Sequence, residues 1–225
     1  MKNKVAKISR SQIELFLECP RCFWLDVKNT IKRPKEFEGG YIGSKYDPLL
    51  KKYFDQHRQN NNVPSEIEEY NLKLFTDLEK LKKWRGNGIE FFHPEHNLIY
   101  YGKIDDLLVA DDKFLIPFDF KTTITNNFQI YESYKRQLEI YGYLLNKIGE
   151  EVLDFGILYV VKIEINDNFD KIEKRQVYVL ENLDYKKYDD ILDDLVKVYN
   201  SDKEPSSGVN CNFCNYFLKR KNLEA

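Results

Sequence analysis

The strongest constraint in this sequence is a pair of apolar segments that carry charges where a buried strand normally has none. The stretch GKIDDLLVADDKFLIPFDFKTT, residues 102–123, predicts two strands joined by a polar turn at residues 110–113. Asp105 interrupts the first segment, and Asp119 and Lys121 interrupt the second. Successive strand residues point to opposite faces, so Asp119 and Lys121 project together, and pairing of the hairpin brings Asp105 close to Asp119. The sequence therefore predicts two carboxylates and one ammonium at a single point.

Two converging carboxylates suit a hard divalent cation such as Mg²⁺ or Mn²⁺. These ions prefer oxygen ligands, so the expected ligands are Asp105, Asp119 and the main-chain carbonyl of Phe120. A bound ion lowers the pKa of a water molecule and neutralises charge on a phosphate under attack, and Lys121 can orient or help deprotonate that water. The alternative is that Asp119 and Lys121 form an ordinary ion pair on a solvent-exposed strand face.

The rest of the chain mixes helical and extended patterns without the regular alternation of a parallel sheet. Helices are expected from Ser9 or Ser11 into Cys19 and over residues 44–56, 65–84, 127–148 and 183–199, with three antiparallel strands over 88–121 and a hairpin turning at 166–168. This order predicts an α/β (α+β) fold in which helices flank a mixed central β-sheet. The 225 residues suit a single domain, residues 1–225, with its core at about 40–200.

The overall charge excludes attraction of the whole surface to a polyanion. Charged residues make up 32% of the chain, but they cancel to a net charge of −2, so any site for nucleic acid has to be a local patch. The first residues, MKNKVAKISRSQ, lack the apolar core of a secretory signal, and no later segment has the length of a membrane span. A cytoplasmic location with no membrane partner is the expectation.

The four cysteines form two C-x-x-C pairs near the two ends of the chain. They are Cys19 with Cys22 and Cys211 with Cys214. Paired motifs of this spacing are typical of a metal site, and four thiolates suit either Zn²⁺ or a [4Fe–4S] cluster. Such a site would clip residues 9–28 to residues 208–222 and would be structural. Buried thiols without a ligand and a redox-active pair are the alternatives, whereas disulfides are not expected in a reducing compartment.

Several short motifs, taken in order, resemble the PD-(D/E)XK nuclease superfamily and specifically its RecB-like and CRISPR-associated exonuclease branch. GKID (102–105) resembles the G-x-x-D strand, DFK (119–121) the D/E-x-K strand and QLEIY (137–141) the Q-x-x-x-Y helix, while CPRCFWL and CNFC resemble the entry and C-terminal cysteine motifs. The resemblance implies a restriction-endonuclease-like fold. It also implies that Gln137 and Tyr141, which lie four residues apart on one helical face, hold the lysine and the scissile strand. A plain core stripe with Leu138 is the alternative for that face.

The chain departs from the family pattern at two places. Family members often carry a metal-binding histidine after G-x-x-x on an early helix, and GSKYD places Asp47 there, as either a metal ligand or an ordinary surface residue. The related nucleases commonly hold their cluster with one N-terminal and three C-terminal cysteines, whereas this chain has two and two, so Cys22 can stand in for the third. The identity of the metal at the cysteines therefore stays open.

The function expected from these residues is metal-dependent hydrolysis of phosphodiester bonds in DNA. The resemblance implies action on single strands or duplex ends in repair, recombination or CRISPR adaptation. Basic and aromatic residues that can contact DNA are Lys103, Lys135, Arg136, residues 219–221, Tyr131 and Tyr134. The competing expectation is a catalytically inactive nucleic-acid-binding or scaffold protein that keeps the nuclease fold.

Overall fold

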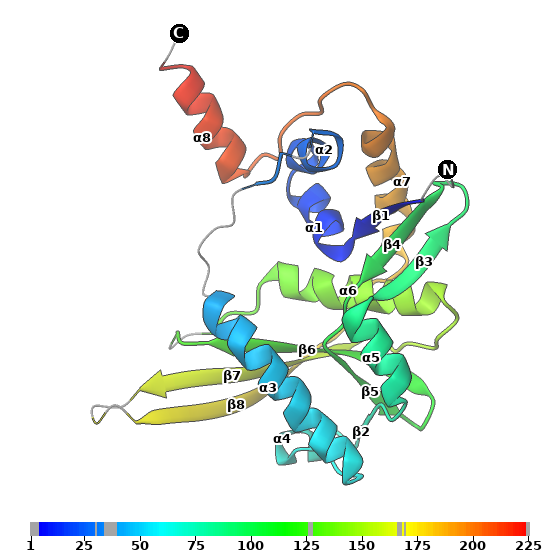
Figure 1. Cartoon of the computed structure of the whole chain (residues 1–225), viewed down its shortest axis with the longest axis vertical. Helices are drawn as coiled ribbons and strands as arrows, with labels where there is room; N and C mark the ends of the chain where they lie inside the picture. Colours follow the sequence, from blue (N-terminus) through cyan, green and yellow to red (C-terminus); the bar gives the residue numbers. More distant parts are fainter. Residues whose placement is uncertain are drawn as a thin grey trace. The chain divides into compact units, whose positions relative to one another are not determined.

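The computed structural model describes residues 5–29, 31–33, 40–125, 128–165, 168 and 170–223. These residues form two compact units (Figure 1). One unit consists of residues 37–91 and 101–185, and we call it the sheet unit. The other brings together residues 1–36, 92–100 and 186–225, and we call it the terminal unit. The expected mixed α/β fold is confirmed, with a five-stranded and a three-stranded sheet in the described part of the chain.

The five-stranded sheet of the sheet unit has the order β2-β5-β6-β7-β8. Its strands are β2 (Lys73–Leu74), β5 (Asp106–Ala110), β6 (Phe114–Thr123), β7 (Gly156–Ile165) and β8 (Lys171–Leu180). Strands β6 and β7 pair in parallel, and every other pair is antiparallel. The parallel pair requires a crossover, which the chain makes through α6 (Glu132–Lys147). The DFK motif therefore lies on the central strand of a mixed sheet.

Helix α3 (Gly40–Gln59) covers one face of this sheet (Figure 1). Its Phe54 ring lies 5.0 Å from Phe118 and stacks on Phe120 at 4.9 Å between ring centroids. All three side chains belong to a buried cluster that also takes in Leu50 and Tyr159. Phe118 and Phe120 thus anchor one face of β6, which leaves Asp119 and Lys121 on the other face, as the alternation of the strand predicts.

The turn between β5 and β6 confirms the predicted hairpin. Asp111 and Asp112 both adopt positive φ, at 51° and 56°, and the Lys113 amide donates to the Ala110 carbonyl at 3.0 Å. Two central residues in the left-handed region define the tight turn whose twist matches the flanking strands, and aspartate tolerates that conformation. The register places Asp106 opposite Phe118.

Two predicted segments divide into other helices and strands than expected. The expected three strands over residues 88–121 are four, because β3 (Ile89–His93) and β4 (Leu98–Gly102) pair with each other and the chain leaves the extended conformation after Gly102. The expected helix over residues 65–84 is α4 (Ser65–Glu68), β2 and α5 (Leu78–Gly86). Asn71 adopts a φ of 52° there, and Asp77 caps α5 by accepting from the Lys80 amide. The pairing of β2 with β5 therefore outweighs the helical pattern of residues 65–84.

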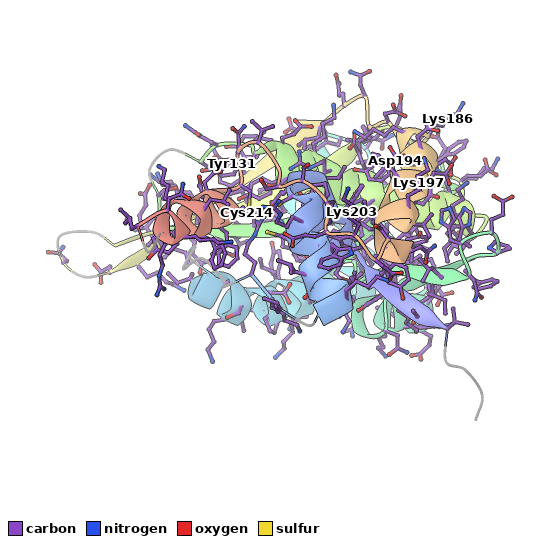
Figure 2. All side chains as sticks on the ribbon, turned by 90° about the horizontal axis from the view of Figure 1, so that it is seen from above. Tyr131, Lys186, Asp194, Lys197, Lys203 and Cys214 are labelled. Atoms are coloured by element: carbon purple, nitrogen blue, oxygen red, sulfur yellow. The ribbon has the colours of Figure 1, made fainter. Side chains whose placement is uncertain are left out.

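The terminal unit contains β1 (Ala6–Ser9), α1 (Arg10–Glu18), α2 (Pro20–Asn29), α7 (Lys187–Asn200) and α8 (Asn212–Lys221). Strand β1 joins β4 and β3 in the three-stranded sheet. Ser9 caps α1 in a capping box with Gln12, so the first of the two predicted helix starts is the one used. Helix α7 buries Leu192 and Leu195, while the ion pair of Asp194 and Lys197 lies exposed on its surface (Figure 2).

The remaining boundaries shift by a few residues. The helix expected over 44–56 is the longer α3, and those expected over 127–148 and 183–199 begin later, as α6 and α7. Residue 127 and the turn residues 166–167 lie outside the described residues. The predicted hairpin is present as β7 and β8, whereas helices α2 and α8 were not expected. In the described part of the chain, no helix has the length and apolar character needed to span a bilayer.

Candidate active site and cysteine centre

Lys121, Asp119 and Gln137 form one hydrogen-bonded group on the face of β6 that looks toward α6. The Lys121 ammonium pairs with Asp119 Oδ2 and donates to Gln137 Oε1 at 2.9 Å. The Gln137 amide nitrogen donates to Asp119 Oδ1 at 2.8 Å and to the Tyr141 hydroxyl at 3.1 Å. Each donor is matched to an acceptor, so the glutamine fixes both the acid and the lysine. The structure thus brings together four of the predicted site residues.

Tyr141 lies in the core and also contacts Gln137. Its ring is buried, as are those of Leu138 and Leu145 one turn away, so the stripe is part of the core. Its hydroxyl nevertheless reaches Gln137. The Tyr141 ring lies so close to Gly102 that a Cβ atom there would come within 3.0 Å of it. The first residue of the GKID motif is therefore a glycine for a packing reason, because a side chain at this position would press on the Tyr141 ring.

Asp105 lies in the bend immediately before β5, not within a strand as predicted. Its Oδ2 accepts from the main-chain amide of Phe120 at 3.2 Å, which ties it to the backbone between Asp119 and Lys121. Its Oδ1 lies 3.0 Å from the Lys51 ammonium, and the same ammonium lies 2.8 Å from Asp47 Oδ2. A shared lysine from α3 therefore joins Asp105 to Asp47, the further ligand that the sequence suggested.

Phe120 was expected to offer its carbonyl to a metal ion. The contact described here is made by its amide, which donates to Asp105, while its side chain stacks in the core. The role of its carbonyl stays a prediction.

The pKa values of Asp119 and Asp105 are shifted in opposite directions. Complete burial raises the pKa of Asp119 to about 7, because Lys121 offsets only part of the cost and the neighbouring Asp105 charge adds to it. Burial also acts to raise the pKa of Asp105, but the Lys51 charge and the hydrogen bonds to Asp105, including that from the Phe120 amide, together outweigh it, and the pKa falls below the usual range. Two close carboxylates with opposed shifts indicate a site that needs positive charge.

A buried network of two arginines and two aspartates supports the bend that carries Asp105. Asp106 is fully buried and accepts from Arg58 Nη2 and, at 2.8 Å, from Arg85 Nη2. Arg85 also donates to both Asp55 oxygens at 2.9 Å and, through Nε, to the main-chain oxygen of Asp105 at 2.7 Å. The guanidinium fork therefore holds the backbone of the candidate ligand directly.

Sequence reasoning missed this network. The available signal was the doublet Asp105-Asp106, because adjacent residues in extended chain point to opposite sides and one of the two acids has to face inward. No pattern in the sequence identifies Arg58 and Arg85 as its partners, since they come from different helices, α3 and α5.

The four cysteines, including Cys214 at the start of α8 (Figure 2), converge in the terminal unit. All four are buried, and their sulfur atoms lie within 4.8 Å of one another. Cys22 Sγ is 3.6 Å from both Cys211 Sγ and Cys214 Sγ, and Cys19 Sγ is 3.8 Å from Cys214 Sγ. The predicted clip between the two chain ends is thus present as a group that can hold a metal ion.

The surroundings of the cysteines shift their thiol pKa values in opposite directions. Burial raises the pKa of Cys22 to about 11. Burial acts in the same direction on Cys19, but hydrogen bonds, first that from the Gly208 amide at 3.2 Å, bring its pKa to about 7. Arg33 donates to Cys211 Sγ at 3.5 Å and supplies a positive charge beside the group. A metal ion that bound all four sulfurs would hold them as thiolates, because cysteine binds a metal in its deprotonated form.

Within the described residues, the cysteines are the only group of three or more potential metal-binding side chains whose ligand atoms all lie within 4.8 Å. The acids Asp47, Asp105 and Asp119 do not form such a group. The ammonium groups of Lys51 and Lys121 lie against their oxygens instead. Each ammonium group offsets the negative charge of the acids that it contacts, and carboxylate oxygens are the kind of donor that a hard divalent ion prefers.

Comparison with known proteins gives structural likeness only. No protein-family model matches this sequence, and no curated protein matches it. The crystal structure of SSO0001 has a TM-score of 0.48 and 15% identity, with 97% of this chain and 87% of that chain covered. A protein from Eubacterium rectale that is called a "putative exonuclease" has a TM-score of 0.50 and 12% identity, with 93% and 87% covered. At this identity the second likeness supports a shared fold with a nuclease-like protein.

Proposed function

We propose that this chain is a divalent-metal-dependent nuclease that hydrolyses phosphodiester bonds in DNA. The observation that carries the proposal is the hydrogen-bonded group of Asp119 and Lys121, on the central strand β6, with Gln137 on α6; Asp105 lies beside this group and accepts from the Phe120 amide. An ordinary surface ion pair would not need a fully buried aspartate, yet Asp119 has no exposed surface. The likeness to the protein called a "putative exonuclease" is consistent with this function.

In this proposal, the residues divide the chemistry between them. Asp105 and Asp119 would hold Mg²⁺ or Mn²⁺, with Asp47 as a further ligand, and the ion would supply an activated water and neutralise the phosphate. The Lys121 ammonium would orient that water or hold the developing negative charge. Gln137 fixes the lysine from the other side, and Tyr141 fixes Gln137. Gln137 and Tyr141 would thus keep Lys121 aligned. Because water is the attacking group, the reaction would need no covalent enzyme intermediate.

Aromatic side chains next to Lys121 favour a single-stranded substrate. The Lys121 ammonium lies 4.8 Å from the centre of the Tyr134 ring, which contacts Phe128 and Tyr131 at 6.0 and 5.4 Å between centroids. Tyr131 itself is 55% exposed (Figure 2). Unpaired bases can stack on such rings whatever their sequence. We therefore propose DNA ends or single strands as the substrate.

We further propose that the four cysteines hold a single Zn²⁺ ion. Four thiolates about 2.3 Å from one tetrahedral ion lie about 3.8 Å apart, and the sulfur separations among Cys19, Cys22, Cys211 and Cys214 include 3.6 and 3.8 Å. In a [4Fe–4S] cluster each thiolate binds a different iron, so the sulfurs stand further apart. The ion would be structural, because four thiolates would fill all of its coordination positions and leave none for a water or a substrate.

Cleavage of labelled oligonucleotides tests the nuclease proposal. The purified chain is incubated with single-stranded and duplex DNA in Mg²⁺, Mn²⁺ or EDTA, and Lys121→Met is compared with the wild type. We expect metal-dependent cleavage that the substitution lowers by about 10² to 10⁴-fold. Lys162→Met is the matched control, because the Lys162 side chain is also 18% exposed, lies on the neighbouring strand and pairs with Glu164.

Two outcomes would contradict the proposal. Cleavage that survives Lys121→Met would exclude the proposed role of this lysine. Binding of DNA without cleavage in any metal would favour the alternative of an inactive nucleic-acid-binding protein.

A further inference from the structure

Lys51 occupies an unusual position in the candidate site. It extends from α3, and its ammonium lies between two carboxylates from separate parts of the sheet unit, 2.8 Å from Asp47 and 3.0 Å from Asp105. The side chain is 24% exposed, so it is partly withdrawn from water. Both acids are proposed metal ligands, and the ammonium contacts one oxygen atom of each, Asp47 Oδ2 and Asp105 Oδ1.

We infer that Lys51 is a built-in competitor for the divalent cation. The inference rests on the proposed function, because it takes Asp47 and Asp105 as ligands. A carboxylate oxygen held by the ammonium is not available to a metal, and two cations at one point repel each other. The ion therefore binds only after Lys51 has moved away. Lys51 thus sets how tightly the site takes its metal.

The two lysines of the site differ in how firmly they are held. Lys121 contacts Asp119, Gln137 and the Tyr134 ring, so three neighbours fix it. The ammonium of Lys51 pairs only with the two acids among the described contacts, and Lys51 also borders an open hollow along α3 lined by Pro48, Lys51, Lys52, Asp55, Gln56 and Gln59. A flexible four-carbon side chain can swing into that hollow and stay hydrated. Lys51 is therefore the ammonium that can leave.

The competitor also has a use before metal is bound. Asp47, Asp105 and Asp119 would otherwise place negative charge together with only Lys121 to offset it, and like charges at this range disfavour the folded chain. Lys51 supplies the missing charge. Loss of its charge is therefore expected to lower the stability of the metal-free protein and, at the same time, to strengthen the binding of metal.

The inference is tested by titrating the full zinc-loaded chain with Mn²⁺ in a calorimeter. Lys51→Met and Lys51→Gln remove the charge in two ways, and Lys51→Arg keeps it. We expect the two neutral variants to bind Mn²⁺ about tenfold more tightly than the wild type. We expect Lys51→Arg to bind as the wild type does. Saturating Mn²⁺ should also raise the melting temperature more in the neutral variants than in the wild type.

Lys52→Met is the matched control, because Lys52 is the exposed neighbour on the same helix and should leave the affinity unchanged. Asp119→Asn gives the background from binding elsewhere. Equal or weaker binding in both neutral variants would overturn the role of Lys51 while leaving the metal site itself intact. If wild type and all variants bind no more Mn²⁺ than Asp119→Asn, the metal site fails and the inference fails with it.

Discussion

Asp106→Asn is expected to destabilise the protein severely although Asp106 takes no part in the proposed chemistry. Asp106 has no exposed surface, and its partners Arg58 and Arg85 have side chains only 2% and 10% exposed. The substitution keeps the shape but removes the charge, and it turns one acceptor into an amide donor that faces a guanidinium. Breaking a buried ion pair from one side costs about 3 to 5 kcal/mol, because the remaining charges stay buried.

The bonds themselves lead to a similar figure. Asp106 accepts two hydrogen bonds from charged groups, each worth about 1.5 to 3 kcal/mol, and Asp55 keeps both arginines partly paired after the change. For a chain of this size, 1 kcal/mol lowers the melting temperature by about 2 to 4 °C. The expected decrease is therefore about 6 to 20 °C, measured by circular dichroism during heating and checked by urea unfolding.

Asp112→Asn is the control for this prediction, since Asp112 lies on the same hairpin and pairs with Lys73, but both side chains are exposed. It should change the melting temperature little. Asp119→Asn should cost less than Asp106→Asn, because Asp119 pairs with one charged side chain, Lys121, whereas Asp106 accepts from two arginines. A decrease for Asp106→Asn no larger than that for Asp112→Asn would refute the reasoning.

The remaining predictions concern the cysteine site and the hydrogen bond to Gln137. Cys22→Ser should reduce the zinc content measured by mass spectrometry to well below one ion per chain, and a colourless wild-type protein with one zinc is the result that excludes a cluster. Gly208→Ala should lower zinc retention in a chelator, because a Cβ there would lie 2.1 Å from a main-chain oxygen of α1, whereas Gly86→Ala has no atom within 4 Å and should not. Tyr141→Phe should slow cleavage about tenfold while changing the free energy of unfolding by about 0.5 to 1.5 kcal/mol, since it removes the hydrogen bond between the Tyr141 hydroxyl and Gln137; an unchanged rate would contradict the positioning role of the hydroxyl.

Local patterns predicted the parts of this protein that depend on neighbours in the chain. The alternation of β6 placed Asp119 and Lys121 on one face and two phenylalanines on the other, and the Asp111-Asp112 turn fixed the hairpin. The capping box at Ser9 was one of the two helix starts that the sequence predicted. These features follow from side-chain direction and backbone preference, which extend over only a few residues.

Helical propensity was misleading where strand pairing outweighed it. Residues 65–84 look helical, yet Lys73 and Leu74 pair with β5, and the backbone turns at Asn71. Such a pairing depends on a strand more than thirty residues away. A pattern within one segment cannot contain that information.

The sequence alone determined the mixed α/β class, the hairpin with Asp119 and Lys121 on one face of its second strand, and the pairing of cysteines from the two chain ends. Only the tertiary structure decided the parallel pairing of β6 with β7, the buried partnership of Asp106 with Arg58 and Arg85, and the position of Lys51 between Asp47 and Asp105. The reason is physical: a charge is buried only where folding brings a partner from a distant segment, and that choice depends on packing of the whole core.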